Sequence, residues 1–151
     1  MASSVRQRLR YDRPLLRKFL IFSIPLLILA MALFHFALEA LGRVPDPAAL
    51  SPAAGRSVPG WVALATWGLE ALSLSALFLL IYNRSGLRML SGLLTGWLAW
   101  VFRGPLLVVT VVSLAGLPAS PWWGMAFGWW VLYTLCGLLL GGAAAAAGMQ
   151  P

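Results

Sequence analysis

The chain has 151 residues, of which 61% are hydrophobic and only 10% are charged. Soluble domains contain about 45–50% apolar and about 25% charged residues, so this composition excludes an ordinary soluble protein and predicts a membrane protein. Eleven lysines and arginines stand against four acidic residues, and six of these cations lie within the first 18 residues. We therefore expect the positive charge to set topology and to contact membrane lipid, and we expect no nucleic-acid partner.

The N-terminal segment, residues 1–16, is predicted to be a basic cytoplasmic tail. The apolar run that follows, from Phe19 to Leu38, is about 20 residues long. It exceeds the 7–15 residues of a signal-peptide core and is not followed by a small-residue cleavage motif, so we expect it to remain as an anchor. The cations expected to set topology and to contact headgroups are Arg6, Arg8, Arg10, Arg13, Arg17, Lys18, Arg84 and Arg88.

Four apolar stretches are long enough to cross about 30 Å of hydrocarbon, which takes about 20 helical residues. Their connections are short, apart from a proline-rich loop after the first stretch, so neighbouring helices are expected to be antiparallel. The predicted fold is an all-α integral membrane protein with a single transmembrane domain, residues 17–151, folded as an antiparallel up-down bundle. We place its four helices at about residues 17–41, 61–82, 90–116 and 122–147.

The positive-inside rule orients this bundle. The N-terminal tail and the turn at Arg84 and Arg88 fall on one side, whereas Arg43 and Arg56 fall on the other. Since the first side carries more cations, both termini are expected to be cytoplasmic. The predicted location is a bacterial cytoplasmic (inner) membrane.

The third helix contains an unusual stretch, WVFRGPLLVV, at residues 100–109. Helical residues 86–116 would span about 46 Å at 1.5 Å per residue, so the helix tilts, begins in the interface, or breaks into two half-helices. A set of polar and small residues shares a sector of about 100° on both sides of the proline, which favours one long helix kinked at Gly104-Pro105. This set is Arg88, Gly92, Thr95, Gly96, Ala99, Arg103, Thr110 and Ser113.

Arg103 needs a partner, because a central arginine costs about 2.5–3.5 kcal/mol on insertion scales. Glu70 lies near the middle of the second helix, at the same depth, and is the predicted counter-ion. His35 reaches the same layer, and Glu39 lies one turn further out. The predicted intramembrane polar layer comprises Glu70, Arg103, His35, Glu39, Thr66, Ser73 and Thr110.

Two interpretations of this polar layer are open. In the structural interpretation, a paired Glu70 and Arg103 set the register and order of the helices. In the functional interpretation, the ionisable cluster carries protons or an anion. The scarcity of titratable residues between Arg103 and the cytoplasmic side favours the structural interpretation.

Catalytic and cofactor motifs are missing from the sequence. His35 is the single histidine and Cys136 the single cysteine, which excludes bis-histidine haem and disulfide frameworks within the chain. We find no metalloprotease, nucleophile-elbow or phosphate-loop motif. We therefore predict no enzyme activity, no metal and no cofactor, with single axial ligation of a haem or chlorin by His35 as an open alternative.

Glycines at four-residue spacing predict close helix packing in the last two helices. Gly128 and Gly137 lie about 180° apart around the fourth helix, so one side can pack internally and the other can meet a partner or a second copy. Alternatively, both sides pack within the bundle. The predicted packing residues are Gly92, Gly96, Gly124, Gly128, Gly137 and Gly141.

The predicted function is that of a non-enzymatic membrane protein that acts through lateral helix contacts, as an accessory subunit or assembly factor of a larger membrane complex. Its expected partners are lipid and other membrane subunits or a second copy. The alternative is a small proton- or anion-linked transporter or channel that uses Glu70, Arg103 and His35.

Overall fold

The computed structural model describes residues 13–41, 60–115 and 119–149, and all of its secondary structure is helical. Four helices are long and apolar enough to cross a membrane, which confirms the all-helical class and the number of long apolar segments. The third is continuous but consists of three parts, α4, η2 and α5. The elements are α1 (Arg13–Ala40), α3 (Gly60–Ser85), α4 (Arg88–Val101), η2 (Phe102–Leu106), α5 (Leu107–Ala115) and α6 (Ala119–Ala146).

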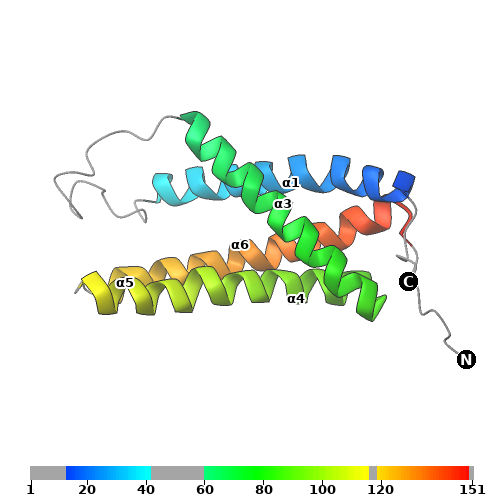
Figure 1. Cartoon of the computed structure of the whole chain (residues 1–151). Coiled ribbons are helices and arrows are strands. Elements are labelled where there is room, and N and C mark those ends of the chain that lie inside the picture. The colour runs from blue at the N-terminus through cyan, green and yellow to red at the C-terminus, as the bar shows by residue number, and fades with distance from the viewer. Residues whose placement is uncertain (1–12, 42–59, 116–118, 150–151) are drawn as a thin grey trace, which may run out of the picture.

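The helices form a ring in which each one has two main neighbours. α1 packs against α3 and α6, and α4 packs against the same two helices from the other side. The start of α1, the end of α3, the start of α4 and the end of α6 lie together at one end of the molecule (Figure 1). We call this the cationic end, because it carries Arg13, Arg17, Lys18, Arg84 and Arg88. The other end, where α1 and α5 end, is called the open end.

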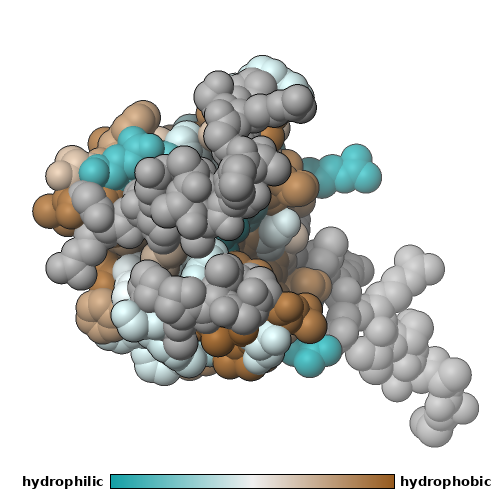
Figure 2. Space-filling view, turned by 90° about the vertical axis from the view of Figure 1, so that its left-hand side faces the viewer, coloured by the Kyte–Doolittle hydropathy of each residue, from teal (hydrophilic) through white to brown (hydrophobic). Residues whose placement is uncertain are grey.

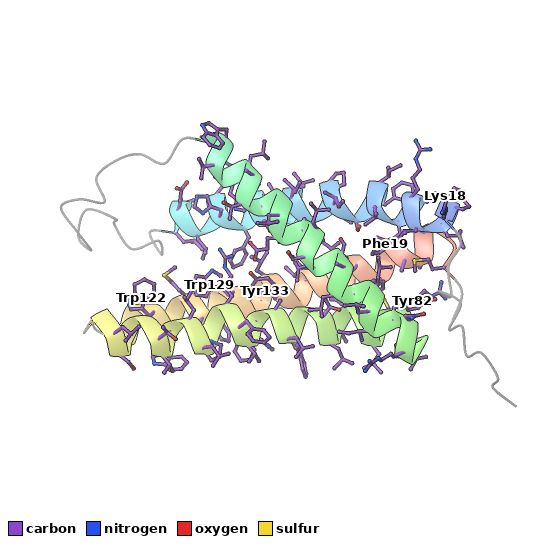
Figure 3. The ribbon with its side chains drawn as sticks, in the orientation of Figure 1. Lys18, Phe19, Tyr82, Trp122, Trp129 and Tyr133 are labelled. Carbon is purple, nitrogen blue, oxygen red and sulfur yellow. The ribbon has the colours of Figure 1, made fainter. Side chains whose placement is uncertain are left out.

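The hydrophobic core lies in the half of the molecule nearer the cationic end. Phe19 of α1 stacks on Phe78 of α3 with 5.2 Å between ring centroids, and Phe78 stacks in turn on Tyr82 at 5.7 Å. Lys18, Phe19 and Tyr82 accordingly lie at the same end in Figure 3. A buried hydrogen bond of 3.2 Å between the hydroxyls of Ser23 and Ser75 also joins α1 to α3. These contacts make α1 and α3 one packed pair.

Packing is sparser toward the open end. α3 packs against α4, whereas α5 packs against α6. On α1 the last buried residue is Met31, and on α3 the first is Ala71. Seen from this end, the described surface mixes hydrophobic residues with pale and hydrophilic ones (Figure 2). Two hollows lie between the helices in this half.

Glycine contacts hold α4 and α6 together. Gly92 of α4 and Gly137 of α6 pack so closely that an added methyl group on either would collide with the backbone carbonyl of the other. Gly96 packs in the same way on the carbonyl of Tyr133, and Gly141 packs on Met89. Close backbone approach of this kind supplies the van der Waals contact that associates helices in lipid. α4 and α6 are thus a second packed pair.

The opposite side of α6 is also used within the chain. The side chains of Phe34 and Leu38 from α1 cover Gly128, with carbon atoms at 3.5 and 3.9 Å from the position of an added methyl group. The two sides marked by Gly128 and Gly137 therefore both pack inside the molecule, in agreement with the second of the two alternatives. Of the six glycines predicted at packing positions, all of them among the described residues, only Gly124 has no atom within 4 Å of an added methyl group.

The third helix passes through Gly104 and Pro105 as a π-helical turn, η2. Pro105 has no N–H, so it cannot bond to the carbonyl of Val101, and the wider turn accommodates this gap without ending the helix. A wider turn also rotates the residues that follow it. Thr110 and Ser113, which follow this turn, are exposed, as is Arg103 within it, whereas Gly104 and Val108 are buried. The single polar face from Arg88 to Ser113 stays a prediction.

Gly104 is required by a neighbouring tryptophan. The indole nitrogen of Trp100 donates a hydrogen bond of 2.8 Å to the carbonyl of Ala126 in α6. A methyl group on Gly104 would lie 2.7 Å from that nitrogen, which is too close for the indole to keep its place. The absence of a side chain at residue 104 thus allows an interhelical hydrogen bond.

Gly104→Ala is expected to lower the free energy of unfolding by about 1 kcal/mol, the usual net contribution of one hydrogen bond. Thermal unfolding in mild detergent, followed by circular dichroism, measures this loss. The same change made in a Trp100→Phe protein should cost clearly less, because phenylalanine has no nitrogen at that position. An equal cost in both proteins would contradict this explanation.

Candidate functional site

An ion pair joins the second and third long helices. The Arg103 guanidinium on η2 donates a hydrogen bond of 3.0 Å from Nη1 to Oε2 of Glu70 on α3. The Glu70 side chain is 16% exposed, whereas the Arg103 side chain is 43% exposed. The structure therefore brings together the two residues that sequence depth had paired, with the carboxylate on the inner side and the arginine on the more open side.

Two aromatic residues of α6 complete the surroundings of this pair. The hydroxyl of Tyr133 donates to Oε1 of Glu70, so both carboxylate oxygens accept a hydrogen bond. The ring of Trp129 lies 5.8 Å from the central carbon of the Arg103 guanidinium, a distance typical of cation–π contact. Trp129 and Tyr133 stand one helical turn apart on α6 and point toward α3 in Figure 3. Three helices thus meet at Glu70 and Arg103.

His35 approaches the same region from α1. Its Nε2 lies 3.3 Å from Oε1 of Glu39, one turn further along the helix. Its ring packs against that of Trp67 on α3, with 5.7 Å between centroids. His35 and Glu39 therefore form a local pair beside the cluster of Glu70 and Arg103.

A cavity of about 70 Å³ lies between these groups. All four long helices contribute to its wall. This partly open cavity has room for water molecules or one small ion, while drug-sized ligands need about 300–1,000 Å³. The lining residues are Met31, Phe34, His35, Leu38, Trp67, Glu70, Arg103, Trp129, Leu132 and Tyr133. We call this space the central cavity.

Three hydroxyl residues predicted for the polar layer lie outside the cluster around Glu70 and Arg103. Thr66, Ser73 and Thr110 are exposed, and each donates to the carbonyl four residues before it in its own helix, at 2.8, 2.9 and 2.8 Å. A hydrogen bond within its own helix satisfies an exposed hydroxyl without any partner helix. The predicted layer is therefore corrected: these three residues are outside it.

Tyr133 and Trp129 are not among the residues predicted for the polar layer, because neither carries a charge that could pair with Glu70 or Arg103. Their spacing of four residues does put both on one face of α6. The same spacing, however, is shared by many packing aromatics in membrane helices. A deep tyrosine at the level of a predicted ion pair was the available signal, because a buried hydroxyl needs a hydrogen-bond partner.

The described topology residues gather at the cationic end. Arg13, Arg17 and Lys18 lie in the first two turns of α1, while Arg84 lies in the last turn of α3 and Arg88 begins α4. Arg13 and Arg17 border an apolar hollow on α1 formed with Leu16, Leu20, Ile21, Ile24 and Pro25. Arg6, Arg8 and Arg10 lie outside the described residues.

Among the described residues, no group of three or more His, Cys, Asp and Glu side chains could hold a metal ion. Comparisons of the chain with protein-family models, with curated proteins and with solved structures found no match.

Proposed function

We propose that the chain spans a bacterial cytoplasmic membrane as an antiparallel up-down bundle with both termini in the cytoplasm. The collection of five described cations at one end supports this orientation under the positive-inside rule. Cysteines introduced at Ser85 and Ser120 test it: an impermeant thiol reagent added to intact cells should label the second and spare the first. Labelling of the cysteine at residue 85 alone would reverse the orientation.

Within the membrane, we propose a non-enzymatic role through lateral helix contacts, as an accessory subunit or assembly factor of a larger complex. The observation that carries this proposal is an apolar groove of about 490 Å³ between α1 and the first half of α6. It is lined by Phe34, Leu38, Leu41, Ser120, Gly124, Met125, Phe127, Gly128 and Val131.

The groove has the composition of a helix-packing surface. Ser120, Gly124 and Gly128 recur at four-residue spacing along α6, and such small-residue rows let a second backbone approach closely. Gly128 is covered by α1, but Gly124 has no atom within 4 Å of an added methyl group. The row is therefore already in close contact with α1 at Gly128, whereas its surface at Gly124 is uncovered. A helix of a partner protein would continue it.

Gly124→Leu tests this contact, because the added side chain would fill the groove. In mild detergent, the wild-type protein should elute in a complex larger than the monomer, and the variant should elute as the monomer. Gly142→Leu is the matched control, since Gly142 also lies on α6 and also has no atom within 4 Å of an added methyl group. An unchanged complex in Gly124→Leu, or equal loss in both variants, would contradict the proposal.

A second candidate function is proton- or anion-linked transport, which the central cavity favours. Charged and titratable groups from three helices, Glu70, Arg103 and His35, line a cavity that can hold a small ion. Intramembrane ionisable residues that face a cavity commonly mark ion pathways.

Flux measurements in proteoliposomes test this second function. Glu70→Gln combined with Arg103→Gln removes both charges while keeping amide groups that can hydrogen-bond, so the bundle should still assemble. Proton or anion flux should be abolished if the pair is a transport site. Flux equal to that of the wild type would exclude it.

A further inference from the structure

The Arg103 guanidinium has unused hydrogen-bonding capacity at the central cavity. A guanidinium carries five N–H donors. Among the described residues, Arg103 makes one hydrogen bond, from Nη1 to Glu70, and one ring contact, with Trp129. Its side chain is 43% exposed and forms part of the cavity wall. Further donors are therefore available to a ligand in the cavity.

The net charge of Glu70 and Arg103 controls whether an anion binds favourably in the central cavity. While Glu70 is a carboxylate, it neutralises Arg103, and an added anion would leave a net negative charge in an apolar environment. When Glu70 accepts a proton, Arg103 loses its counter-ion, and an unpaired charge at this depth is costly. An anion beside Arg103 then restores neutrality. Protonation and anion binding thus favour each other.

We propose that the central cavity binds a proton and a small inorganic anion together, the proton on the Glu70 carboxyl and the anion on Arg103. This inference rests on the second function proposed above and specifies its ligand. The proton comes from water and is held on a Glu70 oxygen, while the anion enters the cavity intact, so that no covalent bond in the anion changes. The loaded site has the same net charge as the empty one.

Tyr133 can serve both states of the site. Its hydroxyl donates to the ionised carboxylate, and a hydroxyl oxygen can also accept. After protonation, the Glu70 O–H can donate to the Tyr133 oxygen, which leaves the Tyr133 O–H free to donate to the anion. The two states therefore need only a rotation of hydroxyl groups and no loss of buried hydrogen bonds.

The cavity has room for a small anion. Its volume of about 70 Å³ accommodates an ion such as chloride or nitrate. Trp67, Trp129 and Phe34 form part of its wall, which is largely apolar around Glu70 and Arg103. A weakly hydrated, compact anion is the ligand that these surroundings favour.

The other titratable groups around Glu70 are few. From α1, His35 lines the cavity with Glu39 bound to it, and from α6 Tyr133 and Cys136 lie nearby. Arg103 is the cation in direct contact with Glu70. Since the His35 and Glu39 side chains pair with each other, Glu70 is the carboxyl whose protonation directly releases Arg103.

Binding of radiolabelled chloride to the full-length protein in detergent, at acid and neutral pH, tests the proposal. Wild-type affinity should be higher at acid pH and should fall by about tenfold per pH unit wherever chloride binding requires the uptake of one proton. A pH indicator in weak buffer should record uptake of a proton with each chloride bound. Nitrate should compete with chloride.

Glu70→Gln is the decisive variant, because glutamine has the shape of a protonated glutamate and can still bond to Tyr133. It should bind chloride at both pH values, with no proton uptake and no dependence on pH. Arg103→Gln should lose binding. Thr66→Val, on α3 one turn before Glu70, is the control and should keep the wild-type pH dependence, because Thr66 bonds to its own helix.

Three results would overturn the proposal: wild-type binding that does not depend on pH, a pH dependence that persists in Glu70→Gln, or undiminished binding in Arg103→Gln. If Arg103→Gln does not fold, the comparison of wild type with Glu70→Gln still decides. Proton-coupled chloride binding without flux in proteoliposomes would support this site and reject transport. Flux that depends on Glu70 and Arg103, in a protein that shows no proton-coupled chloride binding, would reject the proposed joint binding of proton and anion. It would leave the transport function standing.

Discussion

Gly137→Ala is expected to be among the most destabilising single changes in the chain. The added methyl group would collide with the carbonyl of Gly92, which belongs to a helical backbone and cannot rotate away. Overpacking costs about 1–3 kcal/mol in well-packed proteins, and contact with backbone places this variant at the upper end. Gly92→Ala should behave alike, because its methyl group would meet the carbonyl of Gly137. Unfolding in detergent, followed by circular dichroism, measures both losses.

The matched control is Gly142→Ala in the same helix as Gly137. Its methyl group would have no atom within 4 Å, so no packing is lost. This variant should be as stable as the wild type or more stable by about 0.4–1 kcal/mol, because alanine restricts the unfolded chain. Similar melting temperatures for Gly137→Ala and Gly142→Ala would mean that α4 and α6 do not pack through their glycines.

Arg103→Gln alone is expected to be more harmful than its combination with Glu70→Gln. The single change leaves the Glu70 carboxylate, which is 16% exposed, without its cation. Removing one partner of a buried pair costs about 3–5 kcal/mol, and the partial exposure of Arg103 lowers the expected loss to about 2–3 kcal/mol. The double variant carries no charge at this site and should regain part of that stability.

A double-mutant cycle built from the wild type, both single variants and the double variant isolates the interaction between Glu70 and Arg103. Thermal unfolding of all four proteins under one detergent condition supplies the measurements. The two changes should be strongly non-additive, as expected of residues in contact. Additive losses would show that the two side chains act separately and that the ion pair has no part in stability.

Hydropathy alone was sufficient to find the four long helices, because each needs an apolar run whose length is set by the membrane. The boundaries differ by a few residues: the second and fourth helices begin at Gly60 and Ala119 and end at Ser85 and Ala146. The arrangement around Pro105 could not be obtained this way. A π turn and a kinked α-helix can both accommodate the missing N–H of Pro105. They differ in where they place the residues that follow.

The pairing of Glu70 with Arg103 was predictable from depth, since an arginine in an apolar helix requires a counter-ion and few were available. The hydroxyl groups were not predictable by the same reasoning. Thr66, Ser73 and Thr110 can bond to their own helices, so sharing a face with Glu70 or Arg103 does not require them to join the cluster. The Tyr133 hydroxyl lies at the end of a ring, too far from the backbone of its own helix to bond there, and it bonds to Glu70 instead.

The glycine contacts between α4 and α6 have a consequence for how the central cavity can change its volume. Because two backbones already touch, that helix pair cannot be compressed and behaves as one rigid body. The cavity lies between this pair and the helices α1 and α3. Glu70 of α3 bonds to Arg103 and to Tyr133 on the other side of it. Movement of α3 away from the pair would therefore widen the cavity and would break both hydrogen bonds of one carboxylate.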